Sequence, residues 1–192
     1  MSGNYDYIWK IAVGGQGGVG KTTLLHRYIH NEFIEDTKLT IGVQMHTQSL
    51  IRQDRRINLV IWDLGGQERF RFIQGNYMKG SAGAFVMFDM SRYSTFSQIK
   101  EWVDMLRKQC SSSIPIVLVG TKMDLVTDPD ELASVHQSAL ELVDELGLSC
   151  YSPTSSKTNT NIYETIHYLI DLLILWAYQS ESGVGVIETG QY

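Results

Sequence analysis

The sequence has little proline, little cysteine and no long uncharged apolar run. Its 192 residues include three prolines and two cysteines, and no repeat or low-complexity tract is visible. The cysteines, Cys110 and Cys150, lack the spacing of a metal site, so we expect two reduced thiols rather than a disulfide. The apolar run at 169–178 is too short to span a bilayer and contains Asp171, so no transmembrane helix is predicted.

A surplus of basic residues and targeting signals are also missing. Lys and Arg number 16 against 21 Asp and Glu, for a net charge of −5. A surface that binds phosphate backbones needs a basic surplus, so no nucleic-acid partner is predicted. The first ten residues do not form a signal peptide, Ser2 replaces the glycine that myristoylation needs, and no cysteine for prenylation lies near residue 192. These absences predict a cytoplasmic protein.

What is present is the alternation of a layered α/β domain. Apolar runs predict strands at 7–14, 43–51, 56–64, 82–90, 114–122 and 148–155. Helical periodicity is found at 21–33, 95–109, 128–147 and 161–178, and we expect six strands and five flanking helices in all. The hairpin signal RQDR at 52–55 makes one strand an antiparallel edge strand of a mostly parallel sheet. We expect one domain at 1–178 and a flexible tail at 179–192.

The stretch 15–22, GQGGVGKT, has the pattern G-x-x-x-x-G-K-[ST] between an expected strand and an expected helix. Glycine lacks the Cβ that would keep phosphate oxygens from the backbone N–H groups. The helix start adds the positive end of its dipole. Lys21 can reach the β- and γ-phosphates, and the Thr22 hydroxyl can ligate Mg²⁺. The stretch therefore predicts a phosphate loop rather than a flexible glycine-rich turn.

Four more motifs follow in order: LTIGV (39–43), WDLGGQERF (62–70), GTKMD (120–124) and TSSK (154–157). With the phosphate loop they resemble the small GTPases of the Ras superfamily, over residues 7 to about 178. TIGV and GQERFR resemble Rab members, DLGGQ resembles Arf members, and TKMD resembles Rho members. The resemblance implies the P-loop NTPase G domain of a divergent Rab-like protein.

The resemblance places Mg²⁺ and the γ-phosphate beside two polar segments. Thr40 would ligate Mg²⁺ together with Thr22, and Asp63 would hold the ion through its bound water. Gly66 would offer its N–H to the γ-phosphate. Gln67 would orient the attacking water, since its amide both donates and accepts. The predicted catalytic residues are Gln67, Lys21 and Gly66.

Guanine is expected beside GTKMD and TSSK. Asp124 would accept from guanine N1–H and the exocyclic amine, a donor pair that adenine lacks, and Lys122 would lie along the base. Thr121 replaces the asparagine of the commonest pattern, which puts the contact to guanine N7 in question. Ser156 would offer its N–H to guanine O6, and Phe33 would pack edge-on against the base. The predicted nucleotide-binding residues are Gly15, Gln16, Gly17, Gly18, Val19, Gly20, Lys21, Thr22, Thr23, Phe33, Thr40, Gly66, Thr121, Lys122, Asp124, Leu125, Ser155, Ser156 and Lys157.

Two features of the resemblance concern the segments around Thr40 and Gly66. Met45, Trp62 and Tyr77 match the aromatic triad through which Rab relatives bind effectors, with methionine in place of one aromatic side chain. Ordinary packing is the alternative for these three. Thr37 replaces a tyrosine that covers the phosphates in many members, so nucleotide closure would be looser.

The motifs together predict a switch that binds GTP or GDP with Mg²⁺, hydrolyses GTP to GDP and acts in signalling or membrane traffic. Exchange factors, GTPase-activating proteins and effectors are the expected partners. A scaffold that binds GTP without hydrolysing it and an adenine-binding NTPase are the alternatives. His26 and His30 lie four residues apart on a helix, but we expect surface histidines because no third metal ligand is in view.

Overall fold

The computed structural model describes residues 4–35, 39–67 and 71–181, so the predictions for Thr37 and for residues 182–192 of the tail lie outside the described residues. The strands are β1 (Tyr7–Gly15), β2 (Val43–Arg52), β3 (Arg55–Leu64), β4 (Gly83–Asp89), β5 (Ile116–Thr121) and β6 (Cys150–Pro153). The helices are α1 (Lys21–His30), α2 (Arg71–Met78), α3 (Tyr93–Phe96), α4 (Ile99–Gln109), α5 (Pro129–Leu146) and α6 (Ile162–Glu181), with a 3-10 turn, η2 (Met123–Leu125).

The six strands form one sheet in the order β2-β3-β1-β4-β5-β6. Among the strands of the described residues, only β2 runs antiparallel to its neighbour, and Gln53 and Asp54 turn the chain from β2 into β3 with positive φ angles. This confirms the predicted parallel sheet with one antiparallel edge strand. The carboxyl ends of β1, β3, β4 and β5 therefore share one edge, where ligands bind in sheets of this kind.

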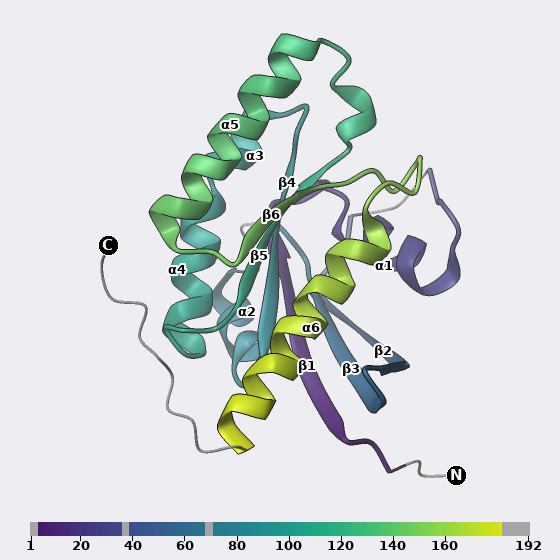
Figure 1. Ribbon diagram of the computed structural model, residues 1–192. Coiled ribbons are helices and arrows are strands. Elements are labelled where there is room, and N and C mark those ends of the chain that lie inside the picture. Colours follow the sequence, from purple (N-terminus) through teal and green to yellow (C-terminus); the bar gives the residue numbers. More distant parts are fainter. Residues whose placement is uncertain (1–3, 36–38, 68–70, 182–192) are drawn as a thin grey trace.

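Helices cover both faces of the sheet (Figure 1). On one face α1 and α6 pack on β1, β3, β4 and β5, and Leu24, Leu25, Ile166 and Leu169 are fully buried there. On the other face α2, α4 and α5 bury Met78, Trp102, Leu106 and Ala139. Five helices of at least eight residues flank the sheet in the described part of the chain, as predicted, and α3 is a short sixth.

Several expected elements differ from the structure in their bounds or burial, and the last helix continues to Glu181, into the expected tail. The first strand is buried only over its second half, and Ile8 is 66% exposed. The helix expected at 21–33 ends at His30, because Asn31 adopts a left-handed conformation. The helix expected at 95–109 is divided into α3 and α4. There the Thr95 hydroxyl donates to the Arg92 carbonyl and accepts from the Asp89 N–H, local bonds that compete with a continuous helix.

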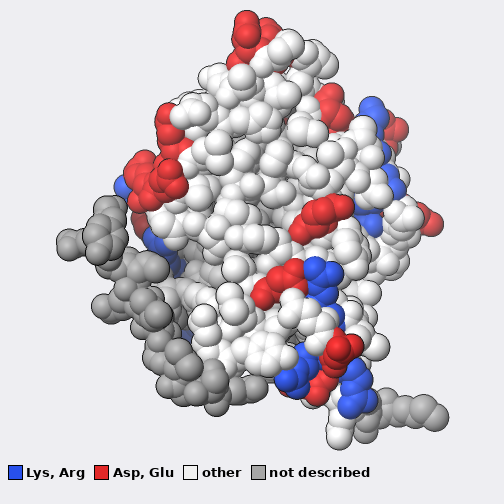
Figure 2. Space-filling view, viewed as in Figure 1, with Lys and Arg blue, Asp and Glu red and all other residues white. Residues whose placement is uncertain are grey.

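The two cysteines, the lengths of the helices and the surface charge bear on predictions made for the whole chain. Cys110 and Cys150 are free thiols, as expected, and burial raises the pKa of Cys150 to about 11. Among the described residues, each helix is too short or too polar to cross a bilayer. Figure 2 shows one face on which acidic and basic side chains are interspersed and separated by uncharged areas.

Candidate functional site

The phosphate loop connects β1 to α1 at the carboxyl edge of the sheet. Lys21, in the first turn of α1, is buried and donates from Nζ to the carbonyl oxygens of Gly15 at 2.8 Å and Gln16 at 3.0 Å. Burial lowers the pKa of Lys21 to about 8, and the charge of Asp63 opposes this shift. A negatively charged group placed beside the loop would favour the protonated amine.

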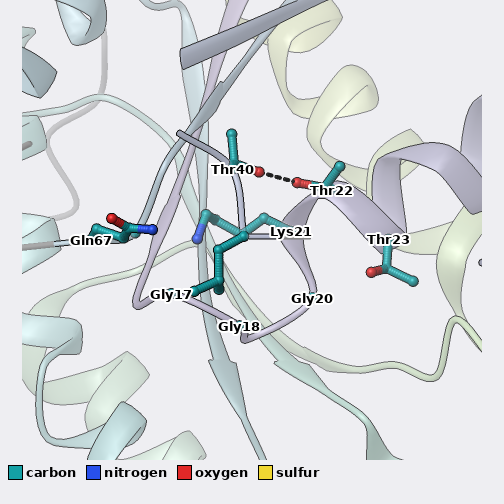
Figure 3. A pocket seen from close by; sticks show the side chains of 10 residues that line it. Gly17, Gly18, Gly20, Lys21, Thr22, Thr23, Thr40 and Gln67 are labelled. Carbon is teal, nitrogen blue, oxygen red and sulfur yellow. Dashed lines mark hydrogen bonds between the residues drawn. The ribbon is translucent and has the colours of Figure 1, made fainter. Parts of the chain in front are cut away.

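Three oxygen-bearing side chains converge beside this lysine. The hydroxyl oxygens of Thr22 and Thr40 lie 2.7 Å apart (Figure 3), and the Thr22 hydroxyl donates to Asp63 Oδ2. Asp63 is fully buried, and its Oδ1 has no hydrogen-bond partner among the described residues. Burial raises the pKa of Asp63, while Thr22 and Lys21 oppose that shift. Hydroxyl and carboxylate oxygens suit a hard divalent cation, which would favour the ionised carboxylate.

The segment after β3 packs directly on the phosphate loop. The Gly17 N–H donates to the Gly66 carbonyl at 3.0 Å, and a Cβ on Gly66 would lie 2.2 Å from the carbonyl carbon of Gln16. A Cβ on Gly65 would lie 2.6 Å from the carbonyl oxygens of Thr40 and Gly42. Glycine at 65 and 66 thus lets three backbone segments meet. The Gln67 side chain lies across the loop from Thr22 (Figure 3), and both side chains line one small cavity beside the loop.

At the opposite end of the loop, the GTKMD and TSSK motifs meet. Asp124, in η2, accepts a hydrogen bond at Oδ1 from the buried Ser155 hydroxyl. The Met123 N–H donates to the Thr154 carbonyl, and the Thr158 N–H donates to the Ser155 hydroxyl oxygen. These bonds fix the Asp124 carboxylate relative to the 155–158 loop.

Thr121 and Lys122 attach the same motif to the phosphate loop. The buried Thr121 hydroxyl lies within hydrogen-bond distance of the Val19 and Phe88 carbonyls and donates its single hydrogen to them. Lys122 Nζ donates to the Gly18 carbonyl at 2.9 Å and lies 2.8 Å from Asp89 Oδ2. The Thr121 hydrogen is therefore used within the protein.

The predicted residues border two adjoining cavities that share Gly18, Gly20 and Thr23. The smaller, of about 40 Å³, is lined by these residues and by Gly17, Lys21, Thr22, Thr40, Gly66 and Gln67. The larger, of about 280 Å³, is lined by them and by Phe33, Thr121, Lys122, Asp124, Leu125, Ser156 and Lys157. Gly15, Gln16, Val19, Asp63 and Ser155 stand behind the cavities as hydrogen-bonding supports. One cavity is thus bordered by a lysine and hydroxyls, and the other by a carboxylate and an aromatic ring.

The structure adds residues that sequence reasoning missed. Leu39 lines the smaller cavity, and Ile34 and Glu35 line the larger one. The buried Gln74 amide donates to the Gly65 carbonyl, and Asp89 holds Lys122. The position of Asp89 at the end of a predicted strand was the one available signal, because strand ends meet at this edge.

The other predicted side chains lie away from the cavities. Trp62 and Tyr77 have ring centroids 5.4 Å apart, and Met45 pairs with Trp62 in the β2–β3 register. Met45 is 58% exposed. The rings of His26 and His30 are 4.5 Å apart, and no cluster of three His, Cys, Asp or Glu side chains suited to a metal occurs in the described ranges.

Comparison with known proteins agrees with this geometry. A model of the Ras family matches residues 10–174. The Ras-related protein RABA4b of Arabidopsis thaliana is 36% identical over 169 residues, which cover 88% of this chain and 74% of that protein. The Ras-related protein YPTC6 of Chlamydomonas reinhardtii is 37% identical over 87% of this chain and 76% of the relative.

A human relative gives the same result at a lower identity. The Ras-related protein Rab-3A of Homo sapiens is 32% identical over 170 residues, 88% of this chain and 76% of that protein. Most of the described fold, from β1 to α6, lies within these matches. The family match, the sheet order and the motifs at its carboxyl edge agree, and the chain belongs to the Ras family as a Rab-like small GTPase.

Proposed function

We propose that this small GTPase binds GTP and GDP with Mg²⁺, hydrolyses GTP, and acts as a switch in membrane traffic. The observation that carries the proposal is the pair of adjoining cavities, whose linings match the two ends of one guanine nucleotide. The triphosphate would lie beside Lys21 and the backbone N–H groups of the loop, with the base between Phe33 and Asp124. Gly18 and Gly20 line both cavities, so one continuous loop would contact both ends of the nucleotide.

The hydroxyl oxygens of Thr22 and Thr40 would hold Mg²⁺ at the phosphate end, and Asp63 would hold the ion through a bound water. The bound ion would neutralise the negative charge that develops on the phosphates during hydrolysis. Thr40 belongs to the segment before β2 and Thr22 to α1, so their contact brings that segment to the phosphate loop. Loss of the γ-phosphate would release this segment and the one that follows β3, and with them a partner surface at Met45, Trp62 and Tyr77.

Lys21, Gly66 and Gln67 would carry the chemistry of hydrolysis. Lys21 would move from the Gly15 and Gln16 carbonyls to the β- and γ-phosphate oxygens. Gln67 would orient the water that attacks in line, since its amide can accept from that water and donate to an oxygen. We expect slow intrinsic turnover, raised roughly 10³–10⁵-fold when a partner supplies an arginine.

Asp124 would select guanine over adenine at the base end. Its carboxylate would accept from N1–H and the exocyclic amine, and the bond from Ser155 fixes one of its oxygens. Each hydrogen bond to a charged group contributes about 1.5–3 kcal/mol, so the loss of both would exclude adenine nucleotides by several orders of magnitude. The proposed role in traffic is supported by the resemblance to Rab proteins, since relatives of this chain are named as Ras-related Rab proteins. A cytoplasmic location stays a prediction.

The nucleotide bound to the purified protein tests the proposal against its alternatives. We expect chromatography of the extracted nucleotide to show GDP, and calorimetry with Mg²⁺ to show a preference for GTP over ATP. GTP alone after long incubation would indicate a scaffold without hydrolysis. An adenine nucleotide, or no uptake of either purine by nucleotide-free protein, would contradict the proposal. Chelation of Mg²⁺ should make nucleotide release faster, which the same assay would show as less nucleotide bound to the protein.

Replacement of Gln67 tests the hydrolytic step separately from binding. Gln67→Leu should slow single-turnover GTP hydrolysis by at least about tenfold, because leucine cannot orient a water, while GTP affinity changes little. Gln137→Leu, on the exposed face of α5, is the control and should hydrolyse GTP at the wild-type rate. Equal rates for wild type and Gln67→Leu would remove Gln67 from the mechanism.

A further inference from the structure

We infer that Arg27, on α1, is a positioning residue that holds both walls of the base-binding cavity, an inference that rests on the proposed function. Its guanidinium donates from Nε to the Ser156 carbonyl at 2.8 Å and from Nη2 to the Lys157 carbonyl at 3.4 Å. It also donates from Nη1 to the Asn31 carbonyl at 2.8 Å, and its Cζ lies 6.0 Å from the centroid of the Phe33 ring.

These contacts join segments that are far apart in the sequence. Ser156 and Lys157 belong to the loop after β6, whereas Asn31 and Phe33 follow the end of α1. Ser156, Lys157 and Phe33 all line the larger cavity, and Arg27 stands behind them, outside that lining. Arg27 itself is half-buried. One side chain thus connects the aromatic wall of the cavity to the loop wall.

The bond to Ser156 also orients a peptide group. In a trans peptide the carbonyl and the following N–H point in opposite directions, and no cis peptide occurs in the described residues. A Ser156 carbonyl directed at Arg27 therefore turns the N–H of Lys157 away from α1, to the side of the loop that lines the cavity. A purine carbonyl oxygen at C6, the acceptor predicted for the Ser156 N–H, is one that the adjacent Lys157 N–H would also recognise.

Only arginine can make this set of contacts with one side chain. Its planar guanidinium has five N–H donors in a fixed fork, which reaches three carbonyl oxygens and still presents a face near an aromatic ring. Lysine has one ammonium at the end of a flexible chain and cannot reproduce the fork. The end of α1 supplies free carbonyls at this point, since the last four carbonyls of a helix lack intrahelical partners.

Arg27→Ala should therefore loosen the base end while the phosphate end stays intact. We expect release of fluorescently labelled GDP, chased by excess unlabelled GDP in Mg²⁺ buffer, to become about tenfold faster or more, because a charge-assisted hydrogen bond is lost on each wall. Arg27→Lys should recover only part of the wild-type rate. Lys108→Ala, at an exposed position near the end of α4, is the matched control and should release GDP as wild type does.

Altered bases separate positioning from a general loss of stability. 6-Thioguanosine diphosphate carries sulfur, a weaker hydrogen-bond acceptor, in place of O6 and keeps N1–H, whereas IDP lacks only the exocyclic amine. Arg27→Ala should reduce the wild-type preference for GDP over the 6-thioguanine nucleotide and leave the preference for GDP over IDP unchanged. Equal release rates in wild type and Arg27→Ala, or equal acceleration for all three nucleotides, would overturn the inference. Wild-type protein that binds no guanine nucleotide would instead refute the proposed function itself.

Discussion

At the residue scale, one buried carboxylate connects the base motif to the phosphate loop. The Asp89 side chain is 1% exposed and lies 2.8 Å from both Lys122 Nζ and Arg92 Nε. Its Oδ1 also accepts from the Ser91 hydroxyl. Burial raises the pKa of Asp89, but the hydrogen bonds from Lys122, Ser91 and Arg92 outweigh burial, and the net shift is downward. Asp89 therefore stays ionised and holds Lys122 against the Gly18 carbonyl.

Asp89→Asn should lower the free energy of unfolding by about 2 kcal/mol at pH 7, because two cations lose their charged partner. A carboxylate with a lowered folded-state pKa contributes its full stability above its unfolded pKa, and that stability is lost as pH falls through the folded value. Urea unfolding should thus show a difference between wild type and Asp89→Asn that is constant from pH 5 to 7 and shrinks below about pH 3.9. A difference independent of pH would contradict the ionic role.

Thr121 is a second residue whose role the structure specifies. Thr121→Val keeps the shape of the side chain and removes the hydroxyl that donates to the Val19 and Phe88 carbonyls. We expect a loss of about 1–3 kcal/mol in urea unfolding, because buried carbonyls lose a donor. Thr121→Ser keeps the hydroxyl and should lose less. The preference for GDP over ADP should not change in either variant, and a lower preference would show that Thr121 contacts the base.

At the element scale, the two segments that flank the β2–β3 hairpin are coupled through backbone contact. The Gly65 N–H donates to the Gly42 carbonyl at 2.8 Å, and Gln74 of α2 donates to the Gly65 carbonyl. The sequence resembles Arf members at Gly65, but only the contact with residues 40–42 explains why a side chain is excluded there. The segment that carries Thr40 and the segment that carries Gln67 therefore share one backbone interface.

Gly65→Ala should separate these segments, because its Cβ would lie 2.6 Å from two carbonyl oxygens that cannot easily move. Thr40 would then lose its place beside Thr22. In the GTP-bound state, where Thr40 would ligate Mg²⁺, we expect the Mg²⁺ concentration that halves the release rate of a non-hydrolysable GTP analogue to rise at least about tenfold, the factor that corresponds to 1.4 kcal/mol. Gly80 has open space around it and a positive φ, a conformation that asparagine tolerates, so Gly80→Asn is the control for glycine replacement. Equal Mg²⁺ dependence in Gly65→Ala and wild type would argue against the coupling.

The sequence predicts which helices and strands exist more accurately than it predicts the residues at which they end. The α5 boundaries were close, since Asp128 caps the first turn through the Asp130 N–H and Gly147 ends the helix in a left-handed conformation. The break between α3 and α4 was missed, because a short amphipathic stretch does not reveal that the Thr95 hydroxyl bonds to the strand end at Asp89. Side chain to backbone bonds between neighbouring elements override local periodicity.

At the scale of the whole molecule, the antiparallel hairpin is attached to the last helix far from the site. Arg52 donates from Nε and Nη2 to the two Asp171 oxygens at 2.8 and 2.6 Å, and Gln53 donates to Asp171 Oδ1 at 2.9 Å. The apolar run at 169–178 contains this aspartate, which sequence analysis used only to exclude a membrane span. Leu169, Ile170, Leu173 and Ile174 of that run are buried in the core, whereas Leu175 and Trp176 are partly exposed.

Arg52→Ala should lower the urea midpoint slightly, and by less than Asp89→Asn does, because the Arg52–Asp171 pair is about one third exposed to solvent. The effect should shrink further in 1 M salt, which screens exposed charges. Arg56→Ala is the control, since Arg56 lies 4.0 Å from Asp6 and is more exposed. Nucleotide release should be unchanged in both variants, and faster release from Arg52→Ala would show that the hairpin and the site are coupled.

The sequence by itself determined the sheet class, the phosphate loop and the motifs that border both cavities. Each of these depends on a few consecutive residues, such as 15–22 or 120–124, whose spacing dictates local backbone geometry and chemistry. Only the tertiary structure decided that Arg27 bonds to Ser156, that Asp89 bonds to Lys122, and that Gly65 touches residues 40–42. These contacts depend on which strand ends lie side by side, and the order of the strands in space brings together residues that no local pattern connects.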